Sequence, residues 1–210
     1  AFYGILKLGC VHVPVNPMFK EHELLYEIND TAAKLIVVQD HLFPIVQAIQ
    51  DQTSLIEIVV TRLTDFLPQS PTIPIHSTLL VPGPDYPGTM DMISILTGQK
   101  PTYPETDVDL DDLAALNYTG GTTGLPKGCE HTQRDMIYTA ATVLATGAGL
   151  RGPNLNPMIL SFFPVFWIAG ENAGVINPVF FGTTLVLLAR WDVEAVLTAI
   201  DRYKITSMGG

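Results

Sequence analysis

The chain has few positive charges, and this shortage excludes several classes of partner. Its 210 residues carry 11 lysines and arginines against 21 aspartates and glutamates, a formal net charge of −10. A protein with this balance repels the phosphates of nucleic acids and the surfaces of anionic membranes. We therefore expect no nucleic acid as a partner, and an anionic nucleotide would need local positive charge to bind.

Cysteine and long apolar runs are also scarce. The two cysteines, Cys10 and Cys129, lie far apart and lack a C-x-x-C spacing. A disulfide framework is therefore not expected, and the reducing cytoplasm is the default location. The uncharged window 152–170 is interrupted by three prolines. It predicts buried strand and helix pieces rather than a transmembrane span.

Apolar residues are plentiful enough for a large core, at 47% of the chain. The expected elements alternate between strand and helix, which predicts an α/β fold with a layered, parallel or mostly parallel sheet flanked by helices. The expected helices cover 21–30, 41–51, 132–148, 168–180 with a break at Pro178, and 193–203. The expected strands cover 34–39, 56–61, 113–118, 158–163, 183–188 and 205–208.

Proline divides the chain into three stretches. Six prolines fall between residues 67 and 87, which predicts an extended, irregular connection. We therefore separate a first α/β segment, 1–61, from a proline-rich connection, 62–106, and a third segment, 107–210.

The third segment contains a run of glycines and threonines typical of a phosphate-binding loop. Residues 118–128 read Tyr-Thr-Gly-Gly-Thr-Thr-Gly-Leu-Pro-Lys-Gly. Glycines let backbone N–H groups approach an anion, threonine hydroxyls add donors, and Lys127 supplies a positive charge. A Walker A loop is excluded, because there the lysine is followed by serine or threonine. The run follows an expected strand, at whose carboxyl end α/β proteins usually bind ligands.

This run closely resembles the signature loop of the adenylate-forming acyl-activating enzymes, which include acyl-CoA synthetases, 4-coumarate-type ligases, luciferases and the adenylation domains of peptide synthetases. Two more segments resemble the family in the same order. Residues 8–17 contain the pattern Gly-x-x-x-x-Pro-x-Asn-Pro, and 163–170 read Phe-Pro-Val-Phe-Trp-Ile-Ala-Gly. The resemblance implies that residues 1–210 are a central piece of the family's large N-terminal AMP-binding domain.

The resemblance also implies an ATP-dependent ligase. In this reaction a carboxylate attacks the α-phosphate of ATP, pyrophosphate leaves with the help of Mg²⁺, and the acyl-adenylate is captured by coenzyme A. The implied residues for ATP are Thr119, Gly120, Gly121, Thr122, Thr123, Gly124 and Lys127, with Lys127 catalytic and Thr119 also the candidate metal contact. The implied substrate-pocket residues are Trp167, Gly170 and Glu171.

Some positions depart from the family's usual residues. Gly120 stands where serine is frequent, and Gln133 and Trp167 stand where histidine is frequent. Unlike histidine, Gln133 and Trp167 cannot accept a proton at neutral pH. These positions therefore offer no acid–base group, and the acyl substrate is harder to infer. The aromatic-rich segment 162–181 favours a hydrophobic carboxylate such as a fatty acid, while aryl and amino acids stay open. The adenine- and ribose-binding motifs and the C-terminal domain of the family are not in these residues, so we expect the chain alone to be inactive.

Several alternatives stay open. The chain could be a non-catalytic nucleotide- or acyl-binding module, and it could form a homo-oligomer. Glu171 either faces the mouth of the acyl pocket or pairs with a distant cation. The pairs Cys10-x-His12 and Cys129-x-His131 would form a zinc site if their strands met. An EF-hand over 107–118 is disfavoured, because its sixth position is Asp112 and its twelfth is Tyr118.

Overall fold

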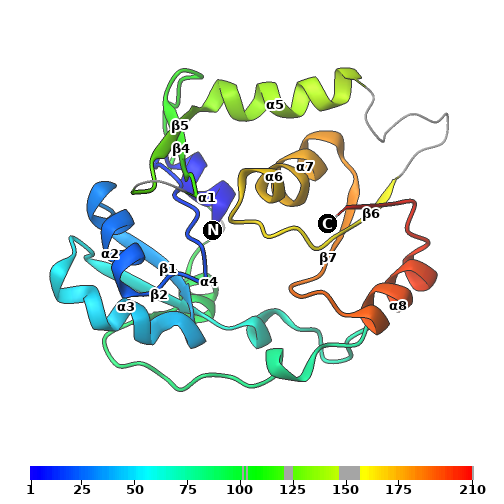
Figure 1. The fold of residues 1–210 in the computed structure, drawn as a ribbon, viewed down its shortest axis with the longest axis horizontal. Coiled ribbons are helices and arrows are strands. Elements are labelled where there is room, and N and C mark those ends of the chain that lie inside the picture. The colour runs from blue at the N-terminus through cyan, green and yellow to red at the C-terminus, as the bar shows by residue number, and fades with distance from the viewer. Residues whose placement is uncertain (101, 103, 121–124, 147–156, 210) are drawn as a thin grey trace. The chain divides into compact units, whose positions relative to one another are not determined.

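A computed structural model describes residues 1–100, 102, 104–120, 125–146 and 157–209. The chain is a mixed α/β protein with parallel strands flanked by helices, as predicted (Figure 1). It divides into two compact units, of which the first comprises Ala1 and residues 15–104, and the second comprises 2–14 and 105–210. Each unit has its own cluster of buried apolar side chains.

The first unit contains a three-stranded parallel sheet in the order β1-β2-β3. Strands β1 (Leu35–Gln39) and β2 (Glu57–Thr61) lie within the predicted ranges. Their central residues are valines and isoleucines, whose branched side chains are favoured on a pleated surface. Strand β3 (Met90–Asp91) is new. It contains only two residues, too few for an alternating pattern to be visible in the sequence.

Helices α2 (Glu21–Asp30) and α3 (Phe43–Ile49) supply most of the core of this unit. Leu24 and Ile28 lie one turn apart on α2 and pack with Phe43 and Val46 of α3. The remaining helical elements are α4 (Met92–Gly98) and the 3₁₀ turns η1 (Asp40–Leu42), η2 (Gln50–Gln52), η3 (Leu63–Phe66) and η4 (Ser77–Leu79). The predicted helix over 41–51 is therefore an α-helix with a 3₁₀ turn at each end.

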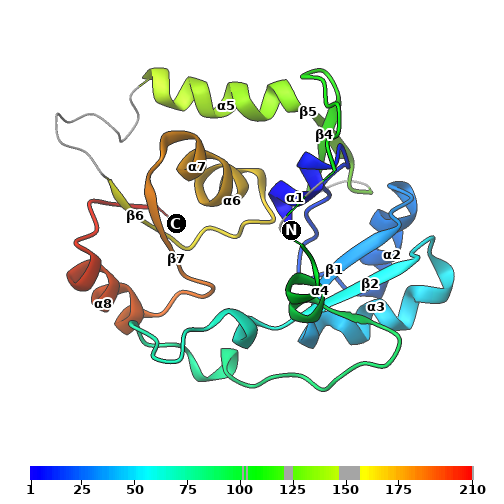
Figure 2. The ribbon, with the colours of Figure 1, turned by 180° about the vertical axis from the view of Figure 1, so that it is seen from behind.

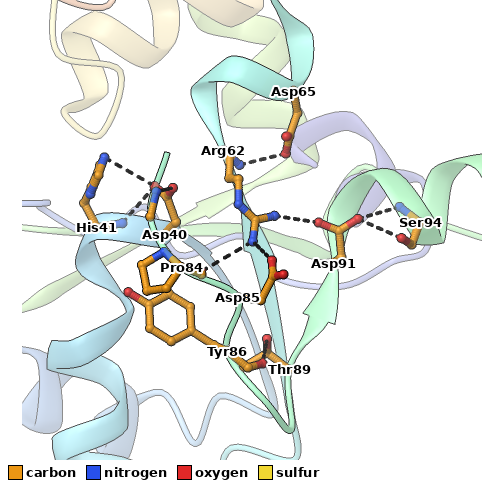
Figure 3. A network of polar contacts seen from close by, with 11 residues as sticks. Asp40, His41, Arg62, Asp65, Pro84, Asp85, Tyr86, Thr89, Asp91 and Ser94 are labelled. Atoms are coloured by element: carbon orange, nitrogen blue, oxygen red, sulfur yellow. Dashed lines mark hydrogen bonds and ion pairs between the residues drawn. The ribbon is translucent and has the colours of Figure 1, made fainter. Parts of the chain in front are cut away.

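Polar side chains at the carboxyl ends of the parallel strands hold the proline-rich connection (Figure 3). Asp40 directly follows β1, and its Oδ2 accepts a hydrogen bond of 2.6 Å from the backbone N–H of Gly83. Arg62 directly follows β2 and donates to Asp85 at 2.6 Å and to Asp91 at 2.9 Å. These bonds replace strand pairing, which explains why a segment rich in proline can stay attached to the sheet.

The second unit begins with helix α1 (Phe2–Lys7) and is organised around β4 (Leu113–Tyr118), which matches its predicted range. β4 forms an antiparallel hairpin with β5 (Gly128–Thr132), a strand that was not predicted. Helix α5 (Gln133–Thr146) follows directly and packs on α7, as the two opposite views show (Figures 1 and 2). The loop that connects β4 to β5 is therefore a hairpin loop.

A second sheet in this unit is parallel, in the order β7-β6-β8. The predicted helix over 168–180 consists of three pieces, with a π-helical turn before Pro178, whose ring nitrogen cannot donate a hydrogen bond. Helix α8 matches its predicted range because Asp192 caps it, accepting a 2.8 Å bond from the N–H of Ala195. The bounds are β6 (Met158–Ser161), α6 (Ile168–Glu171), η5 (Asn172–Ile176), α7 (Asn177–Phe181), β7 (Thr184–Leu187), α8 (Val193–Tyr203) and β8 (Ser207–Gly209).

Within the described ranges, every helix is too short or too polar to cross a membrane.

Glu27 makes the stability of the first unit depend on pH. The residue is 2% exposed, and its Oε1 has no hydrogen-bond partner among the described residues. Burial raises the pKa of Glu27 from 4.5 to about 7. A carboxyl whose pKa is higher in the folded than in the unfolded state binds more protons when folded, so its contribution to stability is lost as pH rises from 4.5 to about 7.

We therefore expect Glu27→Gln to stabilise the protein by about 2 kcal/mol at pH 8 and to have little effect at pH 4.5. Denaturant unfolding of both proteins at the two pH values measures the difference. An equal gain at both pH values would show that the carboxyl does not titrate in this window.

The two carboxylates that bind Arg62 are expected to differ in importance. Asp91 is partly covered and also caps α4, accepting a 2.8 Å bond from the N–H of Ser94, whereas the Asp85 side chain is fully exposed. Asp91→Ala should cost about 1–2 kcal/mol of stability, because it removes a helix cap as well as an ion pair. Asp85→Ala, the matched control, should change the unfolding midpoint little. Equal losses would contradict this ranking.

Candidate functional site

The glycine- and threonine-rich loop is closed at its base by three contacts between Thr119 and Lys127. The N–H of Thr119 donates to the carbonyl oxygen of Lys127 at 3.0 Å, and the Thr119 hydroxyl contacts the Lys127 carbonyl oxygen at 3.4 Å. The N–H of Lys127 donates to the Thr119 Oγ1 at 3.3 Å. Both residues are exposed. A hydroxyl and an ammonium group are thus brought to one end of the β4–β5 hairpin.

Two glycines at this hairpin have different surroundings. A Cβ added to Gly128 would lie 3.2 Å from the ring of Tyr118, so the chain is packed closely there. A Cβ added to Gly120 would meet nothing within 4 Å. A serine at this position would therefore fit, so glycine is not a steric requirement here. The other predicted loop residues, Gly121, Thr122, Thr123 and Gly124, lie outside the described part of the chain.

Helix α5 begins beside the hairpin at Gln133, the position where the resemblance stated above leads one to expect histidine. Its N–H donates to the carbonyl oxygen of Asp112 at 3.0 Å. Its side-chain nitrogen Nε2 is buried and has no hydrogen-bond partner among the described residues. Gln133 therefore fixes the start of α5 through its backbone.

The second predicted group of residues, Trp167, Gly170 and Glu171, lies at α6. Trp167 is 55% exposed and makes an edge-to-face contact with Phe166. Gly170 is buried, and a Cβ added to it would collide with the carbonyl oxygen of Pro164. The same oxygen accepts a 3.1 Å bond from the N–H of Trp167. The backbone before α6 therefore folds directly onto the helix, and only glycine fits at the point of contact.

Glu171 is 1% exposed, and its carboxylate meets Asn117, which the sequence did not single out, and His12, which it suggested only as a zinc ligand. Its Oε2 accepts a 3.1 Å hydrogen bond from Asn117 Nδ2 and lies 3.9 Å from His12 Nδ1. An asparagine in the apolar strand β4 was the one sequence signal that could have suggested this. The basic side chain nearest Glu171 among the described contacts is thus a histidine distant in sequence.

Burial sets the charges in this cluster. It is the main cause that lowers the pKa of His12 from 6.5 to about 4. Burial also raises the pKa of Glu171, which the hydrogen bond from Asn117 partly offsets. His12 is therefore neutral at pH 7, and its approach to Glu171 is a polar contact rather than a salt bridge.

The proposed zinc alternative is not formed. Cys10 and Cys129 are both free and exposed. Nowhere in the described ranges do three or more histidine, cysteine, aspartate or glutamate side chains gather closely enough to hold a metal ion. The acidic run before β4 instead forms a turn, in which the N–H of Asp109 donates to Asp112 Oδ2 at 2.8 Å.

Known proteins match this chain over its whole length. The AMP-binding enzyme family matches residues 1–210. Long-chain-fatty-acid–CoA ligases of Bacillus subtilis and Salmonella typhimurium are 30% and 29% identical to it, and each alignment covers 100% of this chain and 38% of the relative. The 4-coumarate–CoA ligase 3 of Arabidopsis thaliana is 27% identical over 98% of this chain and 33% of its own.

Solved structures agree with this assignment. The anthranilate CoA ligase AuaEII in complex with anthranoyl-AMP superposes with a TM-score of 0.76 at 25% identity, covering 99% of this chain and 36% of that one. A Mycobacterium tuberculosis fatty acyl CoA synthetase shares the fold, with a TM-score of 0.73 at 22% identity over 99% of this chain and 35% of that one. The chain therefore belongs to the AMP-binding enzyme family. It spans about 38% of the length of the bacterial relatives.

The close contact at Gly170 generates a prediction. Gly170→Ala should lower stability by about 1–3 kcal/mol, because the added methyl group forces the Pro164 carbonyl away. Gly120→Ala, where the space is open, is the matched control for steric fit and should change stability far less. Thermal or denaturant unfolding of both variants measures the contrast. A Gly170→Ala protein as stable as wild type would show that the backbone before α6 moves freely.

Proposed function

We propose that residues 1–210 form the phosphate-loop and acyl-pocket part of an ATP-dependent acid–thiol ligase. The parent enzyme would adenylate a carboxylic acid with ATP and transfer the acyl group to coenzyme A. The observation that carries the proposal is the family match over 1–210, together with an exposed Thr119 and Lys127 at the base of one hairpin loop. The relatives named above are CoA ligases, which supports the choice of acceptor.

Lys127 is proposed to stabilise the departing pyrophosphate. Negative charge builds on the β- and γ-phosphates as the carboxylate attacks, so a cation placed at that point lowers the barrier. No described carboxylate forms an ion pair with Lys127, in contrast to Arg62, which is held by two. The Thr119 hydroxyl and the backbone at Gly120 would add donors, as would Gly121, Thr122, Thr123 and Gly124.

A Mg²⁺ ion would fit this loop only with help from the substrate. The described residues offer no cluster of carboxylates for it, and Thr119 is the candidate protein ligand. Mg²⁺ commonly takes most of its ligands from phosphates and water, so one hydroxyl is compatible with such a site. When bound, the ion would neutralise charge on the leaving phosphates.

The acyl substrate is proposed to be hydrophobic, with a fatty acid as the first choice. Trp167 presents half of its surface to solvent next to Phe166, which suits contact with an apolar chain or ring. Gly170 and Glu171 belong to the same pocket segment. Two of the relatives named above are long-chain-fatty-acid–CoA ligases, which supports this choice over aryl and amino acids.

Carboxylate-dependent ATP–pyrophosphate exchange tests the proposal. The assay uses the longest natural chain that contains residues 1–210, with pooled fatty, aryl and amino acids. Exchange with fatty acids would support the ligase and name its substrate class. A folded protein without exchange for any pool would favour a non-catalytic nucleotide- or acyl-binding module. We expect the 210 residues alone to be inactive, and a cytoplasmic location and any homo-oligomer remain predictions.

Lys127→Ala should slow adenylation roughly ten- to more than a hundredfold, since a charge-assisted hydrogen bond is worth about 1.5–3 kcal/mol. Lys204→Ala is the matched control, because this lysine is 80% exposed and pairs with Asp201 at the end of α8. The rate of exchange at saturating ATP and acid measures both. An unchanged rate in Lys127→Ala would refute the assigned role.

A further inference from the structure

Three polar side chains from distant parts of the chain meet inside the second unit. Glu171 ends α6, Asn117 lies in β4, and His12 precedes both by more than 100 residues. Asn117 Nδ2 donates to Glu171 Oε2 at 3.1 Å, and His12 Nδ1 lies 3.9 Å from the same oxygen. We refer to these three residues as the Glu171 cluster.

Stability alone does not explain the Glu171 cluster. Glu171 and Asn117 are 1% and 7% exposed, so both have lost their hydration. Glu171 Oε1, Asn117 Oδ1 and His12 Nδ1 have no hydrogen-bond partner among the described residues. A carboxylate that is buried with one direct bond costs free energy, and an apolar side chain in its place would commonly be as stable or more so. What a directional bond adds is a fixed geometry between the elements that carry its two ends.

The two residues joined by the Asn117–Glu171 hydrogen bond lie next to the two candidate binding segments. Asn117 is two residues before Thr119, at the base of the phosphate-binding loop. On the other side, the N–H of Glu171 donates to the carbonyl oxygen of Trp167 at 2.8 Å, so the pocket residue Trp167 lies one helical turn away. The Gly170–Pro164 contact prevents this turn from moving independently of the chain before it.

His12 supports the same junction from the other edge of β4. Its N–H donates to the carbonyl oxygen of Ala114, and its carbonyl oxygen accepts from the N–H of Leu116, both at 2.9 Å. Its ring packs edge to face on Phe2, with the centroids 4.9 Å apart. The histidine is therefore anchored at its backbone and its ring, and it limits where the Glu171 carboxylate can lie.

We propose that Glu171 is a positioning residue that, through Asn117, aligns the acyl-pocket segment at α6 with the phosphate-binding loop after β4. This assignment rests on the proposed adenylation of a carboxylic acid. The attacking carboxylate and the α-phosphate must meet in line, and a displacement of about 1 Å can cost about a hundredfold in rate. Because Glu171 is buried and bonded to Asn117, it acts on this geometry through its neighbours rather than by touching the substrate.

A reversal of the hydrogen bond tests the proposal in the longest natural chain that contains residues 1–210. Asn117→Asp removes the amide donor and places two carboxyl groups opposite each other while preserving shape. Glu171→Gln in the same protein restores one donor and one acceptor, now with the donor on residue 171. The rate of ATP–pyrophosphate exchange and the KM values for ATP and for the acid are measured at pH 8 for wild type, both single variants and the double variant.

We expect Asn117→Asp to lower kcat about ten- to a hundredfold, with each KM changed less than about threefold. The double variant should recover most of the lost rate, because the pair again forms one hydrogen bond. Thermal melting of each protein measures the folded fraction, and the rates are corrected for it. Glu171→Leu, which fills the space without any bond, should behave as Asn117→Asp does and should not be rescued by a change at Asn117.

The other outcomes would overturn the proposal. A rise in the KM for the acid alone would make Glu171 a residue that lines the pocket. A rate loss that disappears on correction for folded protein would make the cluster purely structural. Independent, multiplicative effects in the double variant would show that the two side chains do not act as a pair. Absence of exchange in the wild-type protein would refute the proposed ligase activity itself. This result needs no variant, so it is distinguishable from a failure of the positioning role.

Discussion

The organisation of the second unit depends on the pairing of β4 on both of its edges. β5 runs antiparallel along one edge, and the backbone of His12 bonds to Ala114 and Leu116 along the other. Ala114 and Ala115 are fully buried, because their small side chains allow other elements to approach closely. A strand held in this way has little freedom, so the residues that follow it, Thr119 and Gly120, begin from a fixed point. The position from which the candidate loop starts is therefore fixed by the strand before it.

A second constraint, the contact between Gly170 and Pro164, acts at α6. It forces the chain that leaves β6 to fold back onto the helix before the helix has completed two turns. Trp167 is thereby held at the surface while Glu171, four residues later, points into the interior. One short helix thus presents an apolar ring to solvent and a carboxylate to β4. One segment thus carries the proposed pocket residue Trp167 and is also anchored to the neighbouring strand.

Much of the fold was predictable because its signals are local. The ranges of α2, β4 and α8 follow from an amphipathic pattern, an apolar strand and a capping aspartate, all of which are visible in consecutive residues. Strand β5 was missed because Gly-Cys-Glu-His-Thr has neither alternation nor strand-forming residues at most positions. It is a strand only because β4 lies opposite to it. The bond between Asn117 and Glu171 was likewise not predicted, since it joins residues 54 positions apart.

The contrast between the two units bears on where the site lies. In α/β proteins the carboxyl ends of parallel strands are the usual place for ligands, and in the first unit this edge carries Asp40, Arg62 and Asp91. Those groups are already bonded to the proline-rich connection and to each other, so their charges are used in holding the chain together. The hairpin after β4 instead presents Lys127 exposed, with no described carboxylate paired to its ammonium group. In a protein with a net charge of −10, an exposed lysine with no described ion-pair partner supplies the local positive charge that the proposed binding of an anionic nucleotide requires.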